Sequence, residues 1–235
     1  MLRSLRYSEA DRILHVYTRE RGRIGAIAKG VRKTKSRFGA RLEPLSHAEL
    51  MLHEGSGELH TVTGVELIRS HRAAREQPYR LAVGLIGAEA MLRLFAEPEP
   101  NARAFEAITR FLDLADETPV GGAAVLDALA LSFQLKLLWL SGYLPHMTSC
   151  AECGADDVPL VGYSPQAGGA VCRADANGSL SLSPAGFAGI EALVSTPLAD
   201  SQAAGLSERA AREALRVVTA SYEYHGGFRL RTLSA

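Results

Sequence analysis

The spacing of apolar residues changes at Pro78, and this change predicts two kinds of structure in one chain of 235 residues. Before Pro78, short runs rich in β-branched and aromatic residues alternate with polar positions, which is typical of half-buried strands. After Pro78, apolar residues recur every three or four positions, which is typical of amphipathic helices. The chain is therefore predicted to be α+β, with a small β-barrel before an all-α region.

The same periodicities give approximate boundaries for each element. Four strands are predicted, over residues 13–18, 23–31, 48–52 and 59–68. Helices are predicted over residues 78–96, 101–115, 123–140, 184–194 and 208–225, the last two preceded by the capping residues Ser183 and Ser207. Residues 146–182 lack a helical period and contain two Gly-containing turn signals, so we predict loops with a short hairpin there.

The formal net charge of zero conceals a division of charge along the chain. Residues 1–41 contain twelve lysines and arginines but three acidic residues, whereas the remainder contains 14 basic and 23 acidic residues. The two parts therefore carry net charges of +9 and −9. Such asymmetry indicates one surface suited to a polyanion and another suited to a different partner.

Half of the basic residues of this N-terminal part fall within thirteen positions, with no acidic residue among them. Cations so crowded on a loop repel one another unless a polyanion lies close, so phosphate binding is their natural use. Phe38 lies inside the run and is predicted either to stack on a base or to pack into the barrel under a solvated loop. The predicted DNA-binding residues are Lys29, Arg32, Lys33, Lys35, Arg37, Phe38 and Arg41.

Sequence motifs give no indication of an enzyme. Gly25 and Gly30 have the spacing of a phosphate-binding P-loop, but Val31 and Arg32 stand where that motif requires lysine and then serine or threonine. The sequence also contains neither a zinc-protease H-E-x-x-H pair nor a G-x-S-x-G nucleophile elbow. We therefore predict no nucleotide cofactor and no catalytic residues.

The three cysteines follow part of a zinc-binding pattern. Cys150 and Cys153 form a C-x-x-C pair, and Cys172 follows after eighteen residues. Asp175 stands where a second pair would place its other cysteine, so a structural Cys3Asp zinc site is one interpretation, with His146 as another candidate ligand. The alternative is a hairpin that packs without metal.

Neither a signal peptide nor a membrane span is predicted. Residues 1–20 carry charge throughout, and the most apolar stretch, residues 120–140, contains Asp127 and Lys136. The sequence therefore predicts a cytoplasmic protein with no membrane partner.

Three segments of the chain resemble one known family. They are residues 8–14 (SEADRIL), residues 22–44, which include KGVRKTKSRFGARLEP, and residues 223–233 (EYHGGFRLRTL). These segments, together with the cysteine region, are similar to the bacterial RecO family of DNA repair and recombination mediators, and to its actinobacterial members in particular.

This resemblance implies an OB-fold over residues 1–70 and a helical domain over 76–235, with a zinc-finger-like element at about 146–178. It implies binding of single- and double-stranded DNA, strand annealing, and action with RecR and single-strand-binding protein to load RecA, all in the cytoplasm at the nucleoid. It assigns DNA binding to the basic positions given above and zinc ligation to Cys150, Cys153 and Cys172.

Two features depart from the family pattern. Asp175 replaces the fourth cysteine. The chain also begins within what the resemblance implies is the first barrel strand, so most of that strand is expected to be missing, which would leave an unpaired sheet edge.

A second function is compatible with the same charge division. The helical region would be a protein-interaction module, and the basic residues would form an arm that docks on an acidic protein partner.

Overall fold

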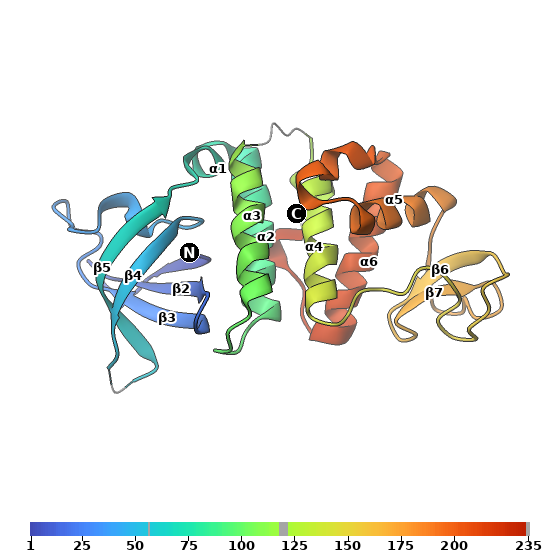
Figure 1. Ribbon diagram of the computed structural model, residues 1–235, viewed down its shortest axis with the longest axis horizontal. Helices are drawn as coiled ribbons and strands as arrows, with labels where there is room; N and C mark the ends of the chain where they lie inside the picture. The colour runs from blue at the N-terminus through green and yellow to red at the C-terminus, as the bar shows by residue number, and fades with distance from the viewer. Residues whose placement is uncertain (56, 118–121, 234–235) are drawn as a thin grey trace. The chain divides into compact units, whose positions relative to one another are not determined.

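A computed structural model describes residues 1–55, 57–117 and 122–233 (Figure 1). The chain forms two compact units, Met1–Pro119 and Val120–Ala235. In the described part of the chain, no helix is both long enough and apolar enough to cross a bilayer.

The first unit contains a five-stranded sheet with the order β1-β2-β3-β5-β4. The pair β3–β5 is parallel and the other neighbouring pairs are antiparallel. This order agrees with the predicted OB-fold, although the sheet is not closed into a complete barrel. The strands are β1 (Arg3–Arg6), β2 (Arg12–Thr18), β3 (Gly22–Ala28), β4 (His47–His53) and β5 (Leu59–Arg69).

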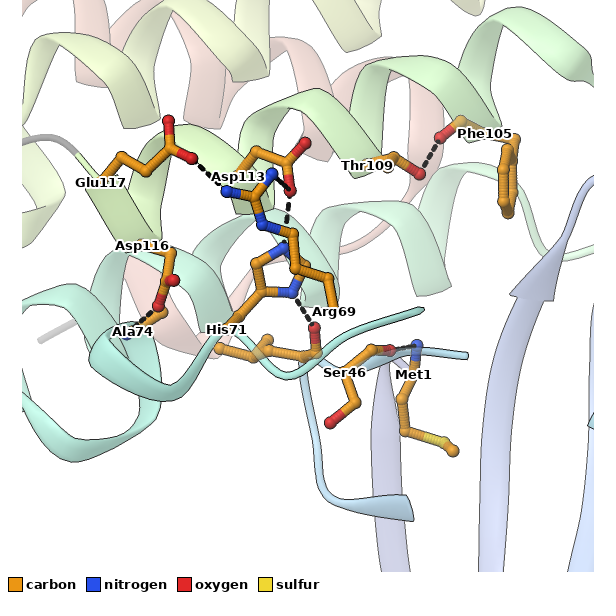
Figure 2. Close-up of polar contacts among 11 residues, drawn as sticks. Met1, Ser46, Arg69, His71, Ala74, Phe105, Thr109, Asp113, Asp116 and Glu117 are labelled. Atoms are coloured by element: carbon orange, nitrogen blue, oxygen red, sulfur yellow. Dashed lines mark hydrogen bonds and ion pairs between the residues drawn. The ribbon is translucent and has the colours of Figure 1, made fainter. Parts of the chain in front are cut away.

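The chain segments that lead into the two edge strands, β1 and β4, are hydrogen-bonded to each other at Met1. The Met1 ammonium group donates to the Ser46 carbonyl at 2.9 Å (Figure 2). The Leu45 amide donates to the Met1 carbonyl at 2.8 Å. Burial lowers the pKa of the Met1 ammonium group to about 5. The four residues of β1 pair with β2 from Arg3 opposite His15 to Arg6 opposite Arg12.

Alternation of side chains fills the interior of the sheet. On β3, Gly22, Ile24, Ala26 and Ala28 are buried at every second position, as a half-buried strand requires. Ile24, Ala26 and Ala28 form one apolar cluster with residues of β2 and β5 and with two residues of the β3–β4 connection. The other members of this cluster are Leu14, Val16, Phe38, Leu42 and Val62.

Three helices complete the first unit: α1 (Arg72–Glu76), α2 (Pro78–Leu94) and α3 (Ala102–Glu117). The absence of a side chain at Gly87 lets the Phe111 ring of α3 approach the α2 backbone closely. The domain boundary between residues 70 and 76 stays a prediction; β5 ends at Arg69 and α1 begins at Arg72. The contacts divide the chain later, at 119/120, because these helices pack with the sheet, as Phe105 does against His47 and Phe95 does against Tyr17.

A buried histidine connects the sheet to the helices of this unit (Figure 2). The Nδ1 atom of His71 lies 2.7 Å from the Leu45 carbonyl, and its Nε2 atom lies 2.8 Å from the Asp113 carboxylate of α3. Arg69 contacts the same carboxylate at 3.2 Å. Both ring nitrogens therefore lie within hydrogen-bonding distance of an oxygen atom, one from the β-sheet side and one from α3.

The second unit packs α4 (Ala128–Leu140), α5 (Pro184–Ser195) and α6 (Glu208–Gly226) beside a small sheet. The predicted helix over 123–140 starts later than expected. The Asp127 carboxylate accepts from the amides of Leu129 at 2.8 Å and Ala130 at 3.3 Å, and so caps α4 at residue 128. Residues Ala124–Leu126 form a separate 3-10 turn, η2.

The region predicted as loops with a short hairpin contains more structure than expected. It forms a three-stranded antiparallel sheet of order β7-β6-β8, made of β6 (Leu160–Ser164), β7 (Gly169–Cys172) and β8 (Leu180–Ser181). The predicted caps Ser183 and Ser207 are confirmed, since each hydroxyl accepts an amide of the helix that it precedes. The remaining short elements are η1 (Gly39–Leu42), η3 (Leu198–Ala204) and η4 (Arg231–Leu233).

Candidate nucleic-acid interface and metal site

The predicted basic residues lie on the connection between β3 and β4, which we call the basic segment (residues 29–41). All six cations of the segment are exposed. The segment carries only one short element, η1. Its fold depends on contacts with neighbouring loops, and these contacts divide the cations into two groups.

The three arginines have partners within the first unit. The Arg32 guanidinium donates to the Glu9 carbonyl at 2.8 Å, in the turn between β1 and β2. The Arg41 guanidinium donates to the Val65 carbonyl of β5 at 3.4 Å. The Arg37 guanidinium lies 4.8 Å from the centre of the Phe38 ring. The Arg41 bond therefore joins the segment to β5 and the Arg32 bond joins it to the β1–β2 turn, whereas the contact of Arg37 with Phe38 lies within the segment. All three side chains keep their charge at the surface.

The three lysines are the freer cations of the segment. The side chains of Lys29, Lys33 and Lys35 make no hydrogen bond or ion pair with any residue that the structure describes. An exposed ammonium group without a carboxylate partner can neutralise a phosphate and release its counterions without breaking a contact of the folded protein. The arrangement therefore supports phosphate binding at these lysines.

Phe38 does not lie where base stacking needs it. Its side chain is 2% exposed and belongs to the apolar cluster of the sheet. Phe38 and Leu42, four residues apart, both turn inward around η1. The structure therefore supports the alternative interpretation, in which the Phe38 ring packs into the barrel. A ring buried in this way cannot stack on a base.

Sequence reasoning missed Arg6. This exposed residue ends β1 and leads into the turn of residues 7–11, which the basic segment contacts through Arg32. Arg6 lies 23 positions before the segment begins, so the run of charges does not include it, whereas the contact of Arg32 with Glu9 joins the turn that follows Arg6 to the segment.

The four predicted metal ligands come together in the second unit. One ligand atom from each of Cys150, Cys153, Cys172 and Asp175 lies within 4.8 Å of every other. An Asp175 carboxylate oxygen lies 3.2 Å from the sulfur atoms of both Cys150 and Cys172. His146 is not part of this cluster; its Nε2 atom lies 2.6 Å from the Ser149 hydroxyl.

Pairing of β6 with β7 explains how the sequence builds this cluster. Cys172 ends β7 opposite Leu160, and its amide lies 3.4 Å from the Cys150 sulfur. The amide of Gly154 bonds the Cys150 carbonyl at 2.8 Å, which closes the turn that carries Cys153. A second turn, with the Asp175 amide bonded to the Cys172 carbonyl at 3.2 Å, returns the carboxylate to the thiols.

Local hydrogen bonds alter the acidity of the ligands. Backbone amides near Cys153 and Cys172 stabilise the Cys150 thiolate and lower the pKa of Cys150. Hydrogen bonds from the thiols of Cys153, Cys150 and Cys172 hold the pKa of Asp175 below its usual value. The Ala155 backbone favours the Cys153 thiolate, but side-chain hydrogen bonds, that with Asp175 foremost, raise the pKa of Cys153 to about 12. Asp175 and Cys150 therefore ionise more readily than usual, whereas Cys153 ionises less readily until a metal ion displaces its proton.

The geometry fits a tetrahedral zinc ion. Zn–S bonds of about 2.3 Å place two tetrahedral thiolates about 3.8 Å apart, which is within the spread of this cluster. Three thiolates and a carboxylate would complete the coordination sphere and leave no open position, so a bound ion would be structural. These four residues could therefore hold a metal ion.

Comparisons with known proteins agree with the resemblance found in the sequence. Residues 1–71 match the family model described as "Recombination protein O N terminal", and residues 75–234 match "Recombination protein O C terminal". Together the two models cover nearly the whole chain.

Curated relatives carry the same name. A protein of Rubrobacter xylanophilus named "DNA repair protein RecO" is 43% identical, over 94% of this chain and 88% of its own length. Proteins of the same name from Frankia casuarinae and Anaeromyxobacter sp. are 38% and 33% identical, over 99% and 98% of this chain and 94% and 91% of their own lengths. The chain therefore belongs to the RecO family of DNA repair proteins.

Proposed function

We propose that this protein is a mediator of DNA repair and homologous recombination that binds single- and double-stranded DNA through phosphates. The observation that carries the proposal is the group of unpartnered, exposed lysines on the basic segment of an OB-type sheet. Membership of the RecO family supports the same function.

The mechanism follows from charge neutralisation. Cations of the basic segment neutralise the phosphates of two strands held at the same surface, which lowers their mutual repulsion and lets complementary bases pair. The acidic remainder of the chain faces protein partners, for which we propose RecR and single-strand-binding protein, with RecA loaded as the outcome. No step of this mechanism requires a nucleotide or a catalytic residue. We propose that the protein acts in the cytoplasm, at the nucleoid, and is not an enzyme.

Salt dependence tests whether DNA is the partner of the basic segment. We expect the affinity for single-stranded and duplex DNA to fall by at least about a thousandfold between 50 and 200 mM salt if about six or more phosphates are contacted. Fluorescence anisotropy of labelled oligonucleotides measures this. If the segment instead docks on an acidic protein, DNA binding would be weak at every salt concentration.

A structural zinc ion in the cysteine cluster is the second part of the proposal. Metal analysis of the purified protein is expected to give about one zinc ion per chain. The variant Cys172→Ser should lose the zinc ion, because the three remaining ligands cannot complete a tetrahedral site. The variant Asp175→Cys should retain the ion. A content below about 0.2 ions per chain in the unaltered protein would show that the cluster packs without metal.

A further inference from the structure

The turn between β1 and β2 presents a large aromatic side chain to solvent. Tyr7 is 61% exposed. Within the described residues its side chain has no hydrogen bond and no ring contact. Its backbone is fixed, since the Tyr7 amide donates to the Asp11 carbonyl at 3.2 Å. An exposed ring on a fixed turn is available to a ligand without rearrangement of the chain.

Contacts between this turn and the basic segment make them one surface. The Arg32 amide donates to the Ala10 carbonyl at 3.0 Å, in addition to the bond from the Arg32 guanidinium to Glu9. The Gly30 amide donates to the Asp11 carboxylate at 2.7 Å. Tyr7 is therefore part of a turn that is joined at three points to the segment that carries the free lysines.

The chemistry of this surface matches a single strand of nucleic acid. Exposed ammonium groups bind phosphates of any strand, but an aromatic ring gains most from the open face of an unpaired base. In a duplex those faces are covered by neighbouring base pairs. A ring beside a row of cations therefore distinguishes single strands from duplex, which cations alone do not.

We propose that Tyr7 stacks on an unpaired base of single-stranded DNA whose phosphates are held by the basic segment. This inference rests on the proposed function and assigns the base contact to the β1–β2 turn instead of Phe38. Arg6, which immediately precedes Tyr7 in the chain, is also exposed and adds a cation at the end of β1. The surface then holds one strand by both its backbone and a base before pairing.

Three substitutions separate stacking from other roles of the side chain. Tyr7→Ala removes the ring, Tyr7→Leu keeps apolar bulk without it, and Tyr7→Phe keeps the ring without the hydroxyl. The turn should survive all three, because its hydrogen bond to Asp11 is made by the backbone. Tyr224→Ala, at another exposed tyrosine (52%) in the second unit, is the matched control.

The probes are a thymidine oligonucleotide, a duplex of the same length, and a strand of the same length with abasic sites. Tyr7→Ala and Tyr7→Leu are expected to weaken binding of the thymidine strand by about fivefold to a hundredfold, the range of one base–aromatic stack. Binding of the duplex and of the abasic strand should stay within about twofold, because only phosphate contacts remain there. Tyr7→Phe and Tyr224→Ala should bind as the unaltered protein does.

Equal loss on all three probes, or no loss on any, would overturn the stacking role. The proposed function fails separately, if the unaltered protein binds none of the probes at low salt. The two failures are therefore distinguishable.

Discussion

Replacing Lys29, Lys33 and Lys35 with glutamate is expected to lower the affinity for DNA by on the order of a hundredfold or more at physiological salt. The three side chains have no partner in the described chain, so their reversal should leave the fold intact. Loss of three phosphate contacts should also flatten the slope of log affinity against log salt by about three. All sequences should be affected alike, since phosphate contacts carry no sequence information.

The control for this variant changes the net charge by the same amount but at residues outside the basic segment. Arg103, Arg110 and Arg216 are exposed on α3 and α6, and replacing them with glutamate should change DNA affinity far less. An equal loss in both variants would mean that net charge, and not the basic segment, determines binding. Unchanged affinity in the lysine variant would contradict the placement of the interface.

His71→Leu is expected to destabilise the first unit by about 3 kcal/mol, because it removes the imidazole that bridges the Leu45 carbonyl and the Asp113 carboxylate. His71 is 1% exposed, and its backbone has a φ of 45°, a left-handed conformation that leucine adopts poorly. Asp113 retains Arg69 at 3.2 Å, which limits the loss. His71→Asn, which tolerates this φ and keeps a donor, should cost less.

Urea unfolding followed by circular dichroism measures this loss in the full chain. Because the chain forms two units, hydrogen exchange in residues 1–117 should report the destabilisation and residues 122–233 should not. Arg72→Leu is the matched control: this neighbouring side chain forms an exposed ion pair with Glu76 and should contribute little. If His71→Leu and Arg72→Leu have the same stability, the buried bridge does not stabilise the unit.

Elements with a clear hydrophobic period could be predicted from the sequence. The alternation on β3 and the helical spacing on α3 predict boundaries within a few residues of those observed, because each element buries one face. The start of α2 is predicted by Pro78 at its first position. The start of α4 was misplaced because apolar residues continue through η2, and the capping bonds of Asp127 decide where the helix begins. The three-stranded sheet was underestimated because β8 has two residues, too few to show a period.

The metal site could be predicted from the sequence, whereas the contacts within the basic segment could not. The spacing of the cysteines predicted the metal ligands, because a C-x-x-C turn and a hairpin both form between residues that are close in the sequence. In the basic segment, charge alone could not tell which cations are bound to backbone carbonyls, as Arg32 and Arg41 are. One feature of the sequence indicates the burial of Phe38: Leu42 follows it by four residues, the spacing of two apolar side chains on one face of a helical turn.

Annealing of complementary strands coated with single-strand-binding protein tests the central claim most directly. The unaltered protein is expected to accelerate the pairing of coated strands, measured by fluorescence quenching between labels on the two strands. The variant with Lys29, Lys33 and Lys35 replaced by glutamate should lose most of this acceleration, and the Arg103/Arg110/Arg216 control should keep it. No acceleration by the unaltered, DNA-binding protein would contradict the mediator function and favour a protein-docking role for the basic segment.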